Sequence, residues 1–131
     1  MKKLSILCLL LVLTVFAACR KDNSEIAQLI VGRWEVQEAL RNGRPTESLA
    51  DLYFEFAPDG KLMTNVSGVP EEGMYELKGE KVLQRNIRFE GDYNVLEISS
   101  EKLVMTTEIQ GFAFRFTLGK GNNASPEELF Q

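Results

Sequence analysis

Alternation of apolar and polar residues over short segments constrains the fold of this chain more than any other feature. A two-residue period is typical of β-strands that bury one face. Turn signals, among them Asn42-Gly43 and Pro58-Asp59-Gly60, separate the segments about every 8–12 residues. The pattern predicts eight short strands, at residues 32–41, 52–57, 61–66, 73–77, 81–89, 93–98, 102–108 and 112–118.

The order of these segments predicts an all-β domain. No helix long enough for a parallel crossover is expected between them, so neighbouring strands should pair antiparallel as a meander. Eight strands can close into a small barrel, which removes both sheet edges, and an open sandwich is the alternative. Ahead of the first strand, Ser24 as N-cap and Gly32 as terminator predict a short helical turn at 25–31. Residues 44–50 are expected to form a loop.

The first nineteen residues have the organisation of an export signal. Lys2 and Lys3 precede an apolar run at residues 4–16, and the small residues Ala17 and Ala18 follow. The run is shorter than the about 20 residues that a membrane-spanning helix needs. An ordinary secretory signal cut after Ala18 and a retained anchor helix are the simpler alternatives.

The segment Phe16-Ala17-Ala18-Cys19 resembles the lipobox of bacterial lipoproteins, although the first lipobox position is usually Leu. The resemblance implies cleavage before Cys19 and diacylation of its thiol, which would anchor the mature protein to a membrane. Because Arg20 is not the Asp that retains many lipoproteins at the inner membrane, the resemblance implies the outer membrane and leaves its periplasmic or surface face open. The expected organisation is signal peptide 1–18, lipidated tether 19–27, barrel domain 28–120 and C-terminal tail 121–131.

Composition excludes several classes of function. Loss of Lys2 and Lys3 would leave 13 of the 15 basic side chains against 19 acidic ones, a net charge of −6, so no nucleic-acid partner is expected. The chain has no histidine, and its two cysteines are Cys8 and Cys19. These absences exclude nucleophilic triads and zinc sites built on His or Cys. We therefore expect no metal, no cofactor and no enzymatic activity.

Further segments resemble the small lipocalin-like lipoproteins of Gram-negative bacteria. Gly32 and Trp34 match the Gly-x-Trp opening of the first lipocalin strand. The resemblance covers about residues 28–118 and implies a small lipocalin-like barrel whose closed end Trp34 plugs. It also implies a basic side chain packed across Trp34 from the last strand, for which Arg115 is the nearest candidate and Lys120 the second. The other matching segments are Tyr53-Phe54-Glu55-Phe56, Pro58-Asp59-Gly60-Lys61-Leu62, Glu72-Gly73-Met74-Tyr75-Glu76-Leu77, Leu96-Glu97-Ile98 and Ser100-Glu101-Lys102-Leu103-Val104-Met105.

One face of the strands should line the barrel interior. Short strands and many aromatic residues favour a filled core over a large cavity. Two functions stay open: a binding module for a small hydrophobic ligand or an envelope partner, and a structural or interaction lipoprotein with a filled core that contacts an envelope protein, for example as an inhibitor. By the period of two, the three Phe residues of the last predicted strand, Phe112, Phe114 and Phe116, should share one environment. The candidate interior and ligand-contact residues are Trp34, Val36, Phe54, Phe56, Phe112, Phe114 and Phe116.

Replacing Cys19 by Ser is expected to abolish lipid attachment, because only a thiol forms the thioether. Metabolic labelling with palmitate should mark the wild-type protein and leave the Cys19→Ser protein unlabelled. Cys8→Ser changes the other cysteine, in the segment expected to be removed, and should not reduce the label. Equal labelling of Cys19→Ser and wild type would contradict the lipobox.

Overall fold

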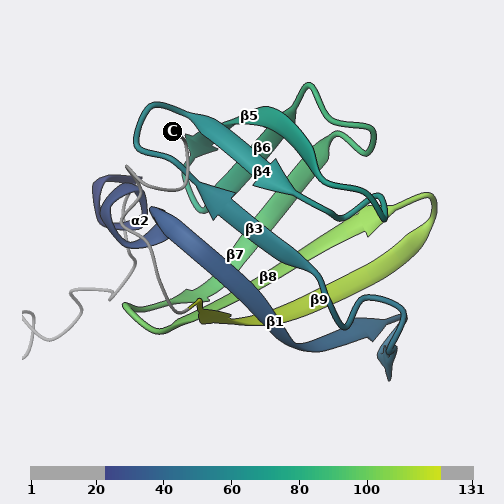
Figure 1. Cartoon of the computed structure of the whole chain (residues 1–131). Helices are drawn as coiled ribbons and strands as arrows, with labels where there is room; N and C mark the ends of the chain where they lie inside the picture. Colours follow the sequence, from purple (N-terminus) through teal and green to yellow (C-terminus); the bar gives the residue numbers. More distant parts are fainter. Residues whose placement is uncertain (1–22, 122–131) are drawn as a thin grey trace, which may run out of the picture.

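The computed structural model describes residues 23–121, which form one helix and nine strands. Cys19, the signal segment and the tail from residue 122 onward lie outside the described residues. Within residues 23–121 no helix is long and apolar enough to cross a membrane. Figure 1 shows the helix, α2, at one end of a sheet that curves round on itself.

The sheet is an antiparallel meander that closes. Strands adjacent in the barrel are also consecutive in the chain, and β9 pairs back with β1, so eight strands form a complete ring. The remaining strand, β2, only adds a two-residue partner to the end of β1. The strands are β1 (Gly32–Arg41), β2 (Arg44–Pro45), β3 (Tyr53–Phe56), β4 (Lys61–Thr64), β5 (Glu71–Lys78), β6 (Lys81–Arg85), β7 (Gly91–Ile98), β8 (Lys102–Ile109) and β9 (Phe112–Lys120).

The predicted eight-stranded antiparallel barrel is confirmed. The open sandwich is wrong, because β1 and β9 pair along almost their whole length, from Trp34 opposite Lys120 to Arg41 opposite Phe114. The prediction that residues 44–50 form only a loop is also wrong, since β2 lies within that segment.

The sixth strand is shorter than predicted. The alternation of residues 81–89 suggested one strand, but β6 ends at Arg85. Asn86 adopts a positive φ of 64°, and its backbone N–H donates to the Glu90 carboxylate at 2.7 Å. This local hydrogen bond turns the chain out of the sheet, and residues 86–90 form a loop between β6 and β7.

Two β-bulges change which residues face inward. One lies between Val36 and Glu38 in β1, and the other between Val95 and Glu97 in β7. The extra residue shifts the alternation by one, so Ala39 is buried where the sequence pattern placed Leu40. The strong bend that a bulge produces is what a strand needs to wrap round a small barrel.

The helix covers one end of the barrel. α2 (Asn23–Ile30) buries Ile26 and Ile30 and packs against β5 and β7. The predicted helical turn is confirmed, although Ser24 lies inside the helix rather than capping it. The expected boundary between tether and barrel, after residue 27, falls within α2.

Trp34 is fully buried at the end that α2 covers. Its indole N–H donates to the Ile30 carbonyl at 2.8 Å, which ties the start of β1 to the end of the helix. Lys120 reaches across it: the ammonium lies 4.4 Å from the Trp34 ring centroid and donates to the Val31 carbonyl at 2.6 Å. Lys120 therefore takes the position expected of Arg115, and that expectation is wrong because Arg115 is exposed on β9.

Trp34→Ala is expected to lower the free energy of unfolding by about 3–5 kcal/mol, the usual range for deleting a buried large aromatic side chain. Urea denaturation followed by circular dichroism measures it. Leu96→Ala truncates a side chain on β7 that is 55% exposed and should change stability by less than about 0.5 kcal/mol. An unfolding midpoint of Trp34→Ala equal to that of the wild type would contradict the plug.

Candidate functional site

The barrel interior is a connected set of aromatic rings. Phe54 is at its centre and touches Tyr93 edge-on at 5.6 Å, Phe116 at 6.3 Å and Phe56 at 6.0 Å between ring centroids. Tyr75 packs edge-on against Phe56 at 5.0 Å. The interior positions predicted for Trp34, Phe54, Phe56 and Phe116 are confirmed, since none of the four side chains is exposed.

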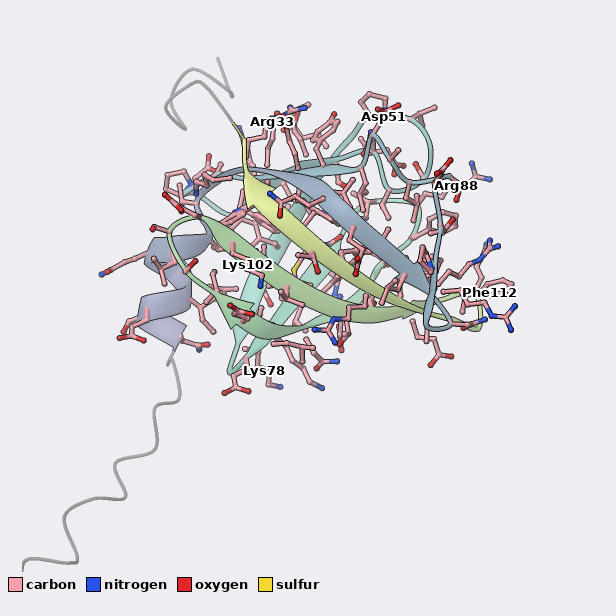
Figure 2. All side chains as sticks on the ribbon, turned by 90° about the horizontal axis from the view of Figure 1, so that it is seen from below. Arg33, Asp51, Lys78, Arg88, Lys102 and Phe112 are labelled. Atoms are coloured by element: carbon pink, nitrogen blue, oxygen red, sulfur yellow. The ribbon has the colours of Figure 1, made fainter. Side chains whose placement is uncertain are left out.

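The three Phe residues of β9 do not share one environment. Phe112 is 44% exposed, Phe114 is half-buried and Phe116 is buried. The prediction that Phe112 lies in the interior is wrong because β1 ends at Arg41, opposite Phe114, so Phe112 extends beyond the barrel rim. Figure 2 shows Phe112 at the end of the barrel opposite the helix, together with Arg88. We call this end the mouth.

The rings of Phe112, Phe114 and Phe116 on β9 run from the mouth into the interior and become steadily less exposed. We call this series the aromatic path. Phe114 stacks on Phe116 at 5.7 Å, and Phe116 in turn lies 6.4 Å from Tyr93. Outside the rim, the Arg41 guanidinium covers the Phe112 ring at 5.5 Å. Val36, the remaining predicted interior residue, is half-buried at the β1 bulge and packs against the edge of the core.

Two polar side chains lie deep in this apolar interior without a partner. Gln84 on β6 and Tyr93 on β7 are no more than 1% exposed. Within residues 23–121, neither polar atom of the Gln84 amide nor the Tyr93 hydroxyl has a hydrogen-bond partner. Leaving a buried polar group unpaired costs about 1–3 kcal/mol, so native proteins rarely do it without a reason.

The strand register places the two groups on the same wall. Val82 pairs with Tyr93, and Gln84 lies two residues further along β6, so both side chains project inward as diagonal neighbours. The direct partner of Gln84 on β7 is Gly91, which has no side chain. A Cβ at Gly91 would meet only the Thr107 hydroxyl, at 4.0 Å. The position opposite Gln84 therefore has space for at least one more carbon atom.

Other buried polar side chains of the barrel do have hydrogen-bond partners. The Thr64 hydroxyl donates to the Tyr53 carbonyl and the Thr107 hydroxyl to the Asp92 carbonyl, each at 2.9 Å. Glu55 is buried on the outer face of β3, where Arg33 donates to it.

The interior around Gln84 and Tyr93 carries no charge among the buried residues that the structure describes. Burial raises the pKa of the Tyr93 phenol, so this hydroxyl keeps its proton and remains a donor at neutral pH. Arg85, the charged residue next to Gln84 in the chain, points outward and lies 3.6 Å from the Asp92 carboxylate. The site is therefore a neutral donor and acceptor pair in an aromatic lining.

The mouth is partly covered by the loop that joins these two strands. Residues 86–90 connect β6 to β7, Ile87 is buried, and Phe89 is half-buried beneath the Arg88 guanidinium. A Cβ on Gly73 of β5 would come within 2.5 Å of the Ile87 side chain, so Ile87 packs directly on that glycine. The loop therefore packs on β5 at the end of β6, next to Gln84.

The outer surface of the barrel has several open hollows. One of them, of about 610 Å³, lies beside the mouth over β7, β8, β9 and the end of β1 and is lined mainly by outward-facing polar residues such as Asn94, Thr106 and Arg115. Two smaller ones, about 260 and 420 Å³, flank the segment between β2 and β3. Across residues 23–121 no group of three or more His, Cys, Asp or Glu side chains is arranged to hold a metal ion.

Comparisons of the chain with protein-family models, with curated proteins and with solved structures returned no match. The sequence pattern indicates the aromatic lining, whereas Gln84 and Tyr93 become candidate site residues only in the structure. The available signal was the alternation in β6, which puts Gln84 on the same face as Val82.

Gln84→Met is expected to raise the free energy of unfolding by about 1–3 kcal/mol, because it replaces an unpaired buried amide by an apolar chain of similar length. Chemical denaturation measures the change. Thr107→Val removes a hydroxyl that is hydrogen-bonded and should shift stability the opposite way, by about 0.5–1.5 kcal/mol. If Gln84→Met destabilises the protein as Thr107→Val does, the Gln84 amide has partners in solution.

Proposed function

We propose that this protein is a lipid-anchored envelope lipoprotein whose lipocalin-like barrel binds a small amphiphilic ligand. The observation that carries the proposal is the pair of buried, unpartnered polar side chains, Gln84 and Tyr93, which lie next to the 86–90 loop where the Tyr93 ring meets the aromatic path at Phe116. A ligand that enters at the mouth would pair with these groups and recover the free energy that their burial costs.

The aromatic lining suits the apolar part of such a ligand. Phe114 is half-buried at the rim, and Phe116 continues the same face inward. The polar atoms of Gln84 are buried, so binding requires the mouth to open. The loop at 86–90 is the segment that covers it, and its movement would expose Gln84 and Tyr93 together because it joins their strands.

A lipid anchor at Cys19 would orient the barrel on its membrane. Asn23, the first residue of α2, is four positions after Cys19 in the chain, and an extended chain of that length reaches at most about 14 Å. Because α2 covers the closed end, that end would lie against the membrane and the mouth would face away from it. The proposed location is the outer membrane, as the lipobox resemblance and Arg20 imply.

The alternative is an interaction lipoprotein with a filled core and no ligand. Its supporting feature is the exposure of Phe112 and Val69 (44% and 57%) on segments at the mouth, where a partner protein would dock. It gives Gln84 and Tyr93 no role, however, and leaves their unpaired burial without compensation. We therefore favour the ligand-binding function.

Photolabelling of the lipidated protein in phospholipid nanodiscs tests this function. The probe is a medium-chain alkyl amide with a diazirine in its chain, and mass spectrometry locates the labelled residues. We expect label on β9 near Phe114 and Phe116, and saturation by unlabelled amide.

Blocking variants locate the binding site. Gly91→Phe would fill the free space beside Gln84 and should remove the interior label, whereas Asp92→Phe places the same ring on the outer face and should keep it. Absence of interior label in the wild type with every probe would overturn the ligand-binding function and favour the filled-core alternative.

A further inference from the structure

The polar pair also specifies the chemistry of the ligand's head group. Resting on the proposed function, we infer that the ligand carries an uncharged head group that both donates and accepts hydrogen bonds, such as a carboxamide or an alcohol, on an apolar body. The inference follows from the hydrogen-bonding capacity of Gln84 and Tyr93 and from the absence of charge around them.

Gln84 and Tyr93 offer both kinds of partner. The Gln84 amide has two N–H donors and a carbonyl acceptor, and the Tyr93 hydroxyl adds a donor and an acceptor. None of these is used within the described part of the chain. A head group that only accepts, such as an ester or ketone, would leave the Gln84 carbonyl unpaired. A head group that has both a donor and an acceptor can pair with both the N–H and the C=O of the amide.

A charged head group does not fit the same position. Burying an ion costs several kcal/mol unless an opposite charge and hydrogen bonds compensate, and no buried cation lies in the described interior. The buried Glu55 carboxylate faces outward and is held by Arg33. Lys120 is at the closed end, held by the Val31 carbonyl and the Trp34 ring. A carboxylate would stay at the rim, near Arg41 above Phe112, rather than enter.

The apolar body of the ligand is inferred from the side chains between the mouth and Tyr93. Between Tyr93 and the rim, the β9 rings at Phe116 and Phe114 offer contact surface without hydrogen-bonding groups of their own. Space for the head group itself lies beside Gly91, where a Cβ would touch only the Thr107 hydroxyl. The ligand would therefore lie with its head at β6 and β7 and its tail along β9 towards the mouth.

Competition with matched ligands tests the head group. The alkyl amide diazirine labels the lipidated protein in nanodiscs, and unlabelled amide, alcohol, carboxylate, trimethylammonium and plain alkane of equal chain length compete. We expect the amide and alcohol to compete at concentrations at least about tenfold lower than the carboxylate and the ammonium, each concentration being corrected for partition into empty nanodiscs.

Substitutions of Gln84 and Tyr93 test whether these two side chains cause the head-group preference. Gln84→Met should weaken amide competition about tenfold and leave competition by the alkane unchanged, because the lining is intact. Tyr93→Phe removes one hydroxyl and should give a smaller loss in the same direction. It also serves as the second variant if Gln84→Met does not fold.

The outcomes separate the two proposals. If no probe labels the interior, the ligand-binding function fails. If the interior is labelled and the carboxylate competes as well as the amide, or if Gln84→Met and Tyr93→Phe keep the wild-type order of competitors, only the head-group inference fails.

Discussion

Pairing of β1 with β9 is the constraint on which the rest of the structure depends. It converts an open meander into a ring and leaves the eight barrel strands with neighbours on both sides. The same pairing sets Lys120 opposite Trp34, which brings the ammonium over the indole, and sets Ala39 opposite Phe116. The bulge at Val36 lets β1 bend enough to meet both β3 and β9. Without this closure there would be no enclosed interior for a ligand or a core.

Inside a closed barrel, the length of a polar side chain decides whether it finds a partner. The hydroxyls of Thr64 and Thr107 lie one bond from Cβ and reach carbonyls of the neighbouring strand. The Gln84 amide and the Tyr93 hydroxyl lie further from the backbone, where the barrel centre is filled with aromatic rings. The sheet cannot satisfy them, because its own hydrogen bonds lie in the wall. A polar group from outside the chain would satisfy them, and this is the physical basis of the proposed function.

The sequence predicts the strands well because burial of one face imposes a period of two, and eight such strands suggest closure. The sequence does not predict burial where it depends on how far along a strand a residue lies rather than on the two-residue period. Phe112 and Phe116 have the same parity, but only the register with β1 shows that Phe112 lies beyond the rim. The bulge in β1 shifts the alternation by one residue, so that Ala39 is buried instead of Leu40. This shift follows from the curvature of the barrel rather than from any local sequence motif. Gln84 was missed because a lone polar residue in a strand resembles a solvent-facing one until its neighbours are known.

The contacts that stabilise the closed end and the proposed binding site lie at opposite ends of the barrel. At the closed end, the indole of Trp34, the helix and Lys120 are joined by hydrogen bonds and ring contact. At the mouth, Gln84 is the penultimate residue of β6 and Tyr93 the third residue of β7, so both lie next to the 86–90 loop. Opening that loop would uncover them while every β1–β9 pair stays formed. Local opening of a loop requires far less free energy than global unfolding. Gln84 and Tyr93, whose unpaired burial is unfavourable, thus lie where a small movement of the 86–90 loop would expose them. The contacts that hold the closed end together do not involve either residue.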